Sequence, residues 1–186
     1  MASINDFEFL NNSTHRQIYS TIREALKYYL IDPKITCIKF RDSLECILDH
    51  IYATIKIEKD DLDLCNRIDL LRKLIEQEKL PKELMSNEII AEMHTLRRVS
   101  NSHHHYNEEE PDPTKDRLTC YMALLKICQW YEEFSKQYPL YLEHKEKEER
   151  ENKEKRKKTW KTIGKIALIP IGIAGAIFGI KIFTKD

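Results

Sequence analysis

The feature that most constrains this chain is an uncharged run of fifteen residues, 166–180, near the end of the sequence. A lysine flanks the run on each side, and lysines at helix ends can extend to the membrane interface. The stretch from Ile163 to Phe183 has 21 residues, which as a helix span about 31 Å, enough to cross the ~30 Å hydrocarbon core of a bilayer. We therefore predict a transmembrane helix over residues 162–183, followed by a short end, 184–186.

Small residues in this segment suit contact between membrane helices. Gly175 and Gly179 have the GxxxG spacing that lets two helices approach closely, and Gly172 lies nearby. Pro170 predicts a kink, because proline removes a backbone hydrogen bond. We expect these four residues to pack membrane helices against one another, which favours a homo-oligomer, a dimer or larger.

The basic residues around the segment predict its orientation. Seven lysines and arginines lie between residues 153 and 165, whereas Lys181 and Lys185 are the basic residues that follow the run. Positively charged flanks stay in the cytoplasm. We therefore expect a tail-anchored, single-pass protein of the inner (plasma) membrane, with its N-terminal domain in the cytoplasm. Trp160 lies where an aromatic anchor would contact the lipid bilayer.

A strongly charged stretch precedes the predicted membrane helix. Residues 143–161 contain no aliphatic side chain, and glutamates recur four residues before lysines or arginines. Such pairs stabilise a helix by about 0.2–0.5 kcal/mol each. The pattern predicts a solvated helical stalk over residues 139–161. Its basic end either contacts anionic lipid headgroups or is a plain spacer, and the sequence leaves both open.

The pattern of residues 1–138 predicts a helical domain. Apolar residues recur at intervals of three and four, and no segment alternates with the period of two that indicates a strand. We therefore expect an all-α fold, a compact helical bundle. The helices are predicted over residues 14–30, from Pro33 through Ile55, and over residues 61–79, 82–100 and 113–138.

Capping residues and apolar stripes support these helices. Asp32 and Pro33 are predicted as N-cap and first helical position, and Asp112 with Pro113 repeats the pattern at the last helix. The residues expected to face the core are Leu44, Ile47, Leu48, Ile51, Tyr52 and Ile55, then Leu64, Ile68, Leu71, Leu74 and Ile75, then Ile89, Ile90, Met93 and Leu96, and finally Leu118, Tyr121, Leu125 and Cys128.

Composition argues against several classes of function. The 31 basic residues equal the 31 acidic ones, so a general attraction to nucleic acid is not expected. The five cysteines include no C-x-x-C pair, and Cys37, Cys46, Cys120 and Cys128 fall in apolar patterns typical of reduced core thiols. No glycine-rich phosphate loop or nucleophile motif is present. We expect no cofactor and no metal site.

One stretch contains side chains suited to phosphate chemistry. Arg97 and Arg98 stand at the end of the fourth predicted helix, and Asn101 and the histidines 103–105 follow in a polar loop. Histidine can exchange protons near neutral pH, and arginine donates two parallel hydrogen bonds to a phosphate. A metal site in the histidine run is disfavoured, because adjacent residues do not readily face one ion.

Three stretches in order resemble the HEPN superfamily, the nucleotide-binding domains named for higher eukaryotes and prokaryotes. They are DPKITCIKFRDSLECILDHIY, which contains Arg41, Leu44 and Glu45, then NRIDLLRKLIEQEKLPKEL, and then MHTLRRVSNSHHH. The resemblance covers roughly residues 25–135 and is strongest for an uncharacterised group often found beside restriction and phage-defence genes. Ser100 stands where that group usually has glycine, so a positive φ there would strain the serine.

The resemblance implies a candidate catalytic site. Many HEPN proteins are metal-independent endoribonucleases that act as dimers, with Arg and His of both subunits in one cleft. In such an enzyme Arg98 would contact the phosphate, His103 or His105 would transfer protons, and Asn101 would orient the loop or the substrate. Glutamates at 108–110 follow directly and would repel an RNA backbone.

A structural role for the same arginines is the competing interpretation. Arg97 or Arg98 could pair with Glu45 and fix the loop to the second helix, with Arg41 as a further pairing residue. The sequence therefore leaves open whether the protein is an enzyme.

From these features we expect a membrane-anchored, HEPN-like effector or sensor of prokaryotic anti-phage defence. Its cytoplasmic domain would oligomerise or bind a protein or nucleotide signal, and its tail helix would act at the membrane. The alternative is a membrane-tethered, metal-independent endoribonuclease toxin with an Arg/His site formed in a dimer, with RNA as the less favoured partner.

Overall fold

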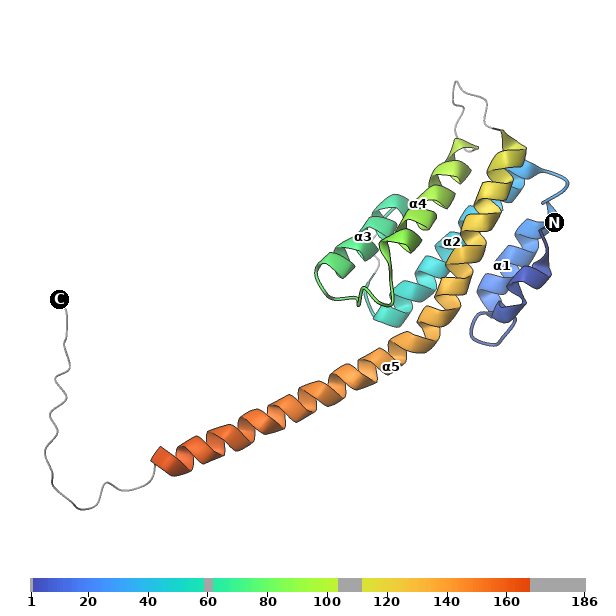
Figure 1. Cartoon of the computed structure of the whole chain (residues 1–186). Coiled ribbons are helices and arrows are strands. Elements are labelled where there is room, and N and C mark those ends of the chain that lie inside the picture. Colours follow the sequence, from blue (N-terminus) through green and yellow to red (C-terminus); the bar gives the residue numbers. More distant parts are fainter. Residues whose placement is uncertain (1, 59–61, 104–111, 168–186) are drawn as a thin grey trace, which may run out of the picture. The chain divides into compact units, whose positions relative to one another are not determined.

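The computed structural model describes residues 2–58, 62–103 and 112–167, with side chains as far as residue 160 (Figure 1). Within these ranges it consists of a 3₁₀ helix, η1 (Ile4–Leu10), and five α-helices: α1 (Arg16–Lys27), α2 (Pro33–Ile55), α3 (Leu64–Glu76), α4 (Asn87–Ser102) and α5 (Pro113–Ala167). No strand occurs in the described ranges, so the predicted all-α fold is confirmed there.

The predicted membrane helix is not placed by the structure. Apart from the backbone of residues 162–167, the segment lies outside the described residues, and with it Pro170, Gly172, Gly175 and Gly179. Among the helices that are described, none combines the length and the apolar character needed to cross a bilayer.

The chain divides into two compact units, residues 1–141 and 142–186. In the first unit, α2 contacts α1, α3 and α4, and Figure 1 shows it between α1 and the α3–α4 pair. The apolar stripe predicted for α2, from Leu44 to Ile55, is buried throughout. Full burial of each such side chain stabilises the fold by about 1.5–3 kcal/mol, so α2 is the centre of the core.

Local contacts determine where α2 begins and ends. Asp32 Oδ1 accepts a hydrogen bond from the Ile35 N–H at 3.0 Å, and Pro33 occupies the first helical position. The predicted N-cap is therefore confirmed, and it satisfies an N–H group that the helix leaves unpaired. The C-terminal cap is Lys56, whose φ of 56° lies in the left-handed region.

Three other helices begin later than predicted, because side chains upstream hold the chain in a turn or cap. Asn12 Oδ1 accepts hydrogen bonds from the N–H groups of Thr14 and His15, and α1 starts only after them. Asp63 caps α3, and Ser86 caps α4. The prediction identified the right helices but extended each one into its capping turn.

The end of α4 corrects the predicted loop. The helix continues through Ser102, and His103 is its C-terminal cap, so Asn101 lies in the last helical turn. The Ser100 hydroxyl donates to the Leu96 carbonyl at 2.7 Å, which satisfies the buried hydroxyl within the helix. Positive φ among the described non-glycine residues is confined to Lys56 and Glu78, so Ser100 does not carry the strain considered for it.

The core face of α5 is shifted from the predicted one. Tyr121 and Cys128 are buried as expected, but Leu118 is 53% exposed and Leu125 is only half-buried. Leu124 and Ile127, which the prediction omitted, are fully buried instead. The predicted residues lay at the margin of the true apolar face, because a helix buries a stripe of about 100° rather than a single line.

The second unit begins within α5. Its backbone is helical from residue 142 to residue 167, and every side chain from 143 to 160 is exposed. One ion pair with the predicted four-residue spacing, Arg150–Glu146, is present at 3.1 Å. An exposed helix without an aliphatic face depends on such pairs and on helix propensity, because tertiary packing contributes nothing to it.

Candidate functional site

An open pocket of about 350 Å³ lies between α3 and α4, which run side by side in Figure 1. Residues of α3 recur there at intervals of three and four, as do residues of α4, so each helix presents one face. The lining residues are Cys65, Asp69 and Arg72 of α3 and Ala91, His94, Arg97 and Arg98 of α4.

Asp69 is the polar centre of this α3–α4 pocket. Its Oδ1 lies 3.2 Å from Nε2 of His94 and 3.7 Å from Nη1 of Arg72. Its Oδ2 accepts a hydrogen bond from the Cys65 thiol at 3.7 Å. The carboxylate therefore contacts an imidazole of α4 and a guanidinium of α3.

The surroundings of His94 favour its neutral imidazole form. Burial lowers the pKa of His94 below its ordinary value, and although the Asp69 carboxylate acts in the opposite direction, Arg97 and Arg72 lower the pKa further. Its side chain is 14% exposed, so it can reach a ligand in the pocket. A neutral imidazole of this kind can donate or accept one hydrogen bond, or take up a proton.

The charge of the α3–α4 pocket is positive. Arg72, Arg97 and Arg98 face a single carboxylate, that of Asp69. Arg98 is exposed, whereas the Nε of Arg97 is buried without a hydrogen-bond partner among the described residues. Guanidinium groups arranged around an open cavity attract oxyanions and donate paired hydrogen bonds to them.

His103 belongs to a different part of the fold. Its side chain is fully buried, and its Nε2 lies 3.2 Å from Oδ2 of Asp116 on α5, within ion-pair distance but outside hydrogen-bond geometry. Arg98 instead lines the pocket beside α3. The sequence pattern suggested that Arg98 and His103 act together. Within the described residues of one chain, the two side chains instead contact different parts of the fold.

The other residues that the sequence singled out also lie outside the α3–α4 pocket or outside the described residues, except Arg97. Asn101 is half-buried in the last turn of α4, and His105 lies outside the described residues. Arg41 pairs with Glu45 within α2 at 3.0 Å. The main-chain carbonyl of Glu45 accepts a long hydrogen bond, 3.5 Å, from Arg67. Among the described residues no ion pair joins Glu45 to Arg97 or Arg98, the two partners that the sequence suggested. Both arginines line the α3–α4 pocket instead.

Sequence reasoning overlooked Asp69, Arg72 and His94. One signal was available, because His94, Arg97 and Arg98 are spaced three and four residues apart on one helix and must share a face. The partner residues on α3 had no such signal, since they are 22 or more residues away in sequence. Only the packing of α3 on α4 brings Asp69 beneath His94.

Comparison with known proteins places this domain in a family. No curated protein and no solved structure matches the chain. The family DUF4145, described as a domain of unknown function, matches residues 23–157. The match includes α2, α3 and α4 and every residue that lines the α3–α4 pocket. Since it covers most of the sequence, this chain belongs to the DUF4145 family.

Proposed function

We propose that this protein is a membrane-anchored, HEPN-like sensor or effector whose helical domain binds a phosphate-bearing signal in the α3–α4 pocket. The observation that carries the proposal is the convergence of Arg72, Arg97 and Arg98 on one open pocket of about 350 Å³. This volume falls within the range of about 300–1,000 Å³ that small-molecule sites occupy. A nucleotide-sized anion is therefore the class of ligand that fits best.

The polar groups of the pocket favour a phosphate over a simple carboxylate. Arg97 and Arg98 line the pocket from α4, and Arg72 lines it from α3. A phosphate presents three oxygens to such a set, whereas a carboxylate presents two. Because the surroundings of His94 favour its neutral form, it can serve as a hydrogen-bonding group without adding positive charge.

Membrane attachment is supported by the sequence of residues 162–183, of which the structure describes only the backbone of 162–167. Residues 166–180 are uncharged, lysines flank them, and seven basic residues precede the run. We propose that this segment crosses the inner membrane once, with the DUF4145 domain in the cytoplasm. Gly172, Gly175 and Gly179 would then let the membrane helices of an oligomer pack together.

The role in antiviral defence rests on the resemblance to the HEPN group found beside restriction and phage-defence genes. In this proposal, the ligand or a protein partner causes the cytoplasmic domains to assemble. Assembly raises the local concentration of the attached membrane helices, and this favours their association even if their affinity for one another is weak. Clustered helices would then perturb the membrane.

Expression in bacterial cells tests the proposed action at the membrane. Three forms are compared: the full chain, a chain lacking residues 162–186, and an Arg97→Gln/Arg98→Gln double variant, with growth, membrane potential and RNA integrity as readouts. We expect the full chain to arrest growth and depolarise the membrane while RNA stays intact, and both altered forms to lose these effects. Arg16→Gln/Arg23→Gln, which changes two exposed arginines on α1, is the matched control. Full activity of the shortened chain would overturn the proposal.

Direct binding tests the ligand class. Purified full chain in detergent is titrated with pyrophosphate, ATP and acetate by calorimetry. We expect binding of the two phosphate compounds and none of acetate. Equal weak heats for all three compounds would show that the α3–α4 pocket does not select phosphates.

A second candidate is a metal-independent endoribonuclease, and one observation favours it. The pocket places the neutral imidazole of His94 beside Arg97 and Arg98, which are the residue types needed to move a proton and to contact a phosphate. This alternative predicts cleavage of RNA without added metal, also by the chain lacking residues 162–186. Cleavage should disappear in the Arg97→Gln/Arg98→Gln variant. Intact RNA in all samples would exclude it.

A further inference from the structure

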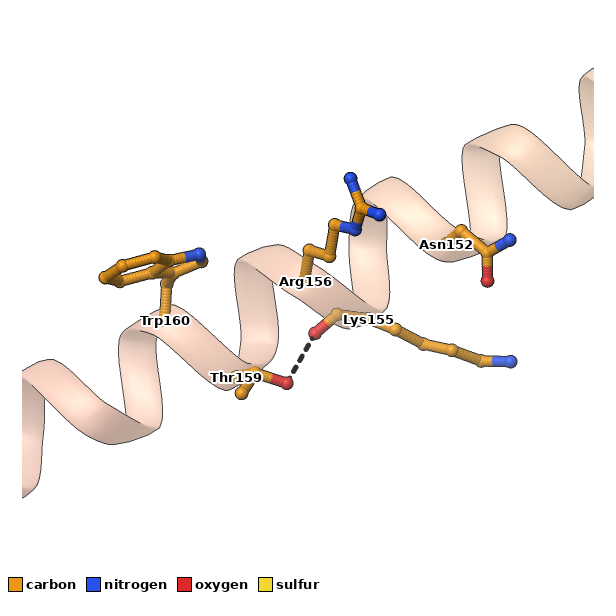
Figure 2. A pocket seen from close by; sticks show the side chains of 5 residues that line it. All are labelled: Asn152, Lys155, Arg156, Thr159 and Trp160. Carbon is orange, nitrogen blue, oxygen red and sulfur yellow. Dashed lines mark hydrogen bonds between the residues drawn. The ribbon is translucent and has the colours of Figure 1, made fainter.

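The exposed helix of the second unit has a pocket on one face (Figure 2). Its volume is about 390 Å³, and it is lined by Asn152, Lys155, Arg156, Thr159 and Trp160. These residues recur at intervals of three and four along one helix, so they lie on one side of it. We call this surface the Trp160 face. The DUF4145 match ends at residue 157, before Thr159 and Trp160. The Trp160 face shares no lining residue with the α3–α4 pocket.

Charge along this helix is unevenly distributed. Residues 143–151 contain five glutamates and three lysines or arginines, whereas residues 152–160 contain one glutamate and five lysines or arginines. The first part forms ion pairs within the helix, such as Arg150–Glu146 at 3.1 Å. In the second part a single carboxylate cannot neutralise five cations. The Trp160 face therefore lies in a strongly positive part of the helix.

Trp160 is the second unusual feature of this helix. Its indole is 73% exposed and stands beside Arg156, one helical turn earlier, as Figure 2 shows. An exposed indole costs free energy in water, but at a membrane surface its apolar ring and its N–H each find a suitable environment. The Thr159 hydroxyl donates to the Lys155 carbonyl at 2.9 Å, so it projects little from the helix and leaves the face open.

We propose that the Trp160 face binds the headgroups of anionic phospholipids, with Lys155 and Arg156 on the phosphates and Trp160 in the interfacial layer. The inference rests on the proposed membrane attachment and adds to it a choice of lipid. Basic side chains next to an aromatic residue could also suit RNA. The membrane is favoured because an uncharged run begins at residue 166, within six residues of Trp160, and would hold this helix close to a bilayer.

The proposal predicts that binding to anionic lipid depends on which side of the helix carries the basic residues, and not only on their number. At 100° per residue, Lys157 and Lys158 each lie roughly 130° from the centre of the Trp160 face. Lys155→Gln/Arg156→Gln and Lys157→Gln/Lys158→Gln therefore remove the same charge from opposite sides. Full chain in detergent is diluted into phosphatidylcholine vesicles, or into vesicles that also contain phosphatidylglycerol, and the bound fraction is measured by flotation across a range of lipid concentrations.

We expect the wild-type chain to prefer the anionic vesicles, and the preference to fall in high salt as charges are screened. A basic side chain at the surface contributes about 5-fold, so Lys155→Gln/Arg156→Gln should reduce the preference by about 25-fold. Lys157→Gln/Lys158→Gln should reduce it much less. An equal loss in both variants, or no loss in either, overturns the proposal.

Two further measurements separate the possible failures. Binding of the wild-type chain to phosphatidylcholine vesicles tests the membrane attachment by itself, since it does not require lipid charge. Absence of that binding, together with a retained preference for anionic vesicles, would reject the anchor and keep the Trp160 face. Flotation is repeated with a labelled short RNA as competitor. RNA that is bound by the wild type and lost in Lys155→Gln/Arg156→Gln, while vesicle binding persists, would assign the face to RNA instead.

Discussion

His94 on α4 places its Nε2 atom 3.2 Å from Oδ1 of Asp69 on α3, so a half-buried imidazole and a carboxylate meet in a pocket that is otherwise rich in arginine. The contact joins two helices that are separated by a long turn in the sequence. The Asp69 carboxylate raises the pKa of His94, against the effect of burial. The same carboxylate offsets part of the positive charge of the pocket.

Asp69→Asn should therefore lower the pKa of His94 further, because the carboxylate that raises it is removed. It should also strengthen the binding of pyrophosphate about 3- to 10-fold, since in a water-filled open pocket a negative charge about 4 Å away repels an anion by about 1 kcal/mol. Imidazole NMR signals followed through a pH titration measure the first effect, and calorimetry measures the second. Asp42→Asn, which changes an exposed carboxylate on α2, should alter neither. A higher pKa of His94 in Asp69→Asn would contradict the expected coupling.

The fold should lose stability in mild acid because of two histidines whose pKa burial lowers, His94 and the more deeply buried His15. His15 is 4% exposed, and burial lowers the pKa of His15 below its ordinary value of 6.5. Below pH 6.5 the unfolded chain therefore binds a proton that the folded chain does not, so stability falls as pH falls, by at most about 1.4 kcal/mol per pH unit and per histidine.

Thermal unfolding between pH 8 and pH 5 measures this dependence. His15→Gln, which cannot titrate, should flatten the decrease in Tm below pH 6.5. His144→Gln removes an exposed histidine from the second unit and should leave the wild-type slope unchanged. A slope in His15→Gln as steep as in the wild type would assign the acid sensitivity to another group.

Tyr52→Phe should destabilise the first unit by about 0.5–1.5 kcal/mol, the usual net contribution of one hydrogen bond. The Tyr52 hydroxyl donates to the main-chain carbonyl of Arg67 at 2.6 Å in a buried setting, and the substitution removes this bond. Tyr19→Phe is the matched control, because its hydroxyl donates to Glu8 at the surface, where water can replace it. We expect a change below about 0.5 kcal/mol for the control. Urea unfolding followed by circular dichroism compares the two, and equal losses would contradict the role of burial.

Residues close together in sequence made much of the fold predictable. The stripe from Leu44 to Ile55 repeats every three to four residues, and Asp32 and Pro33 stand directly before its helix. Both features are local, and both were correct. Helix ends were less predictable, because Ser100 and Ser102 have side chains that suit a loop, yet their hydroxyls bond back to helical carbonyls and the helix continues.

The α3–α4 pocket was less accessible to sequence reasoning for a physical reason. The sequence identified Arg97 and Arg98 as candidates. It paired them with the histidines at 103–105, because those histidines follow shortly after them in the chain. His103 points into the protein toward Asp116, whereas His94, one turn before Arg97 and Arg98, shares their face. Which histidine accompanies the arginines depends on how α4 is rotated against α3 and α5, and tertiary packing decides that rotation.

The two interpretations of the arginines make opposite predictions for His103→Gln. If the α3–α4 pocket is the binding site, Arg98→Gln should weaken pyrophosphate binding by about 10-fold or more, since a charge-assisted hydrogen bond contributes about 1.5–3 kcal/mol. His103→Gln should change it less than twofold, because that side chain is buried beside Asp116. Calorimetry on full chains, with Arg23→Gln as the control for loss of an exposed arginine, measures both effects. If His103→Gln loses as much affinity as Arg98→Gln while its urea midpoint is unchanged, the site lies at the end of α4 and the pairing of Arg98 with His103 inferred from sequence is the correct one.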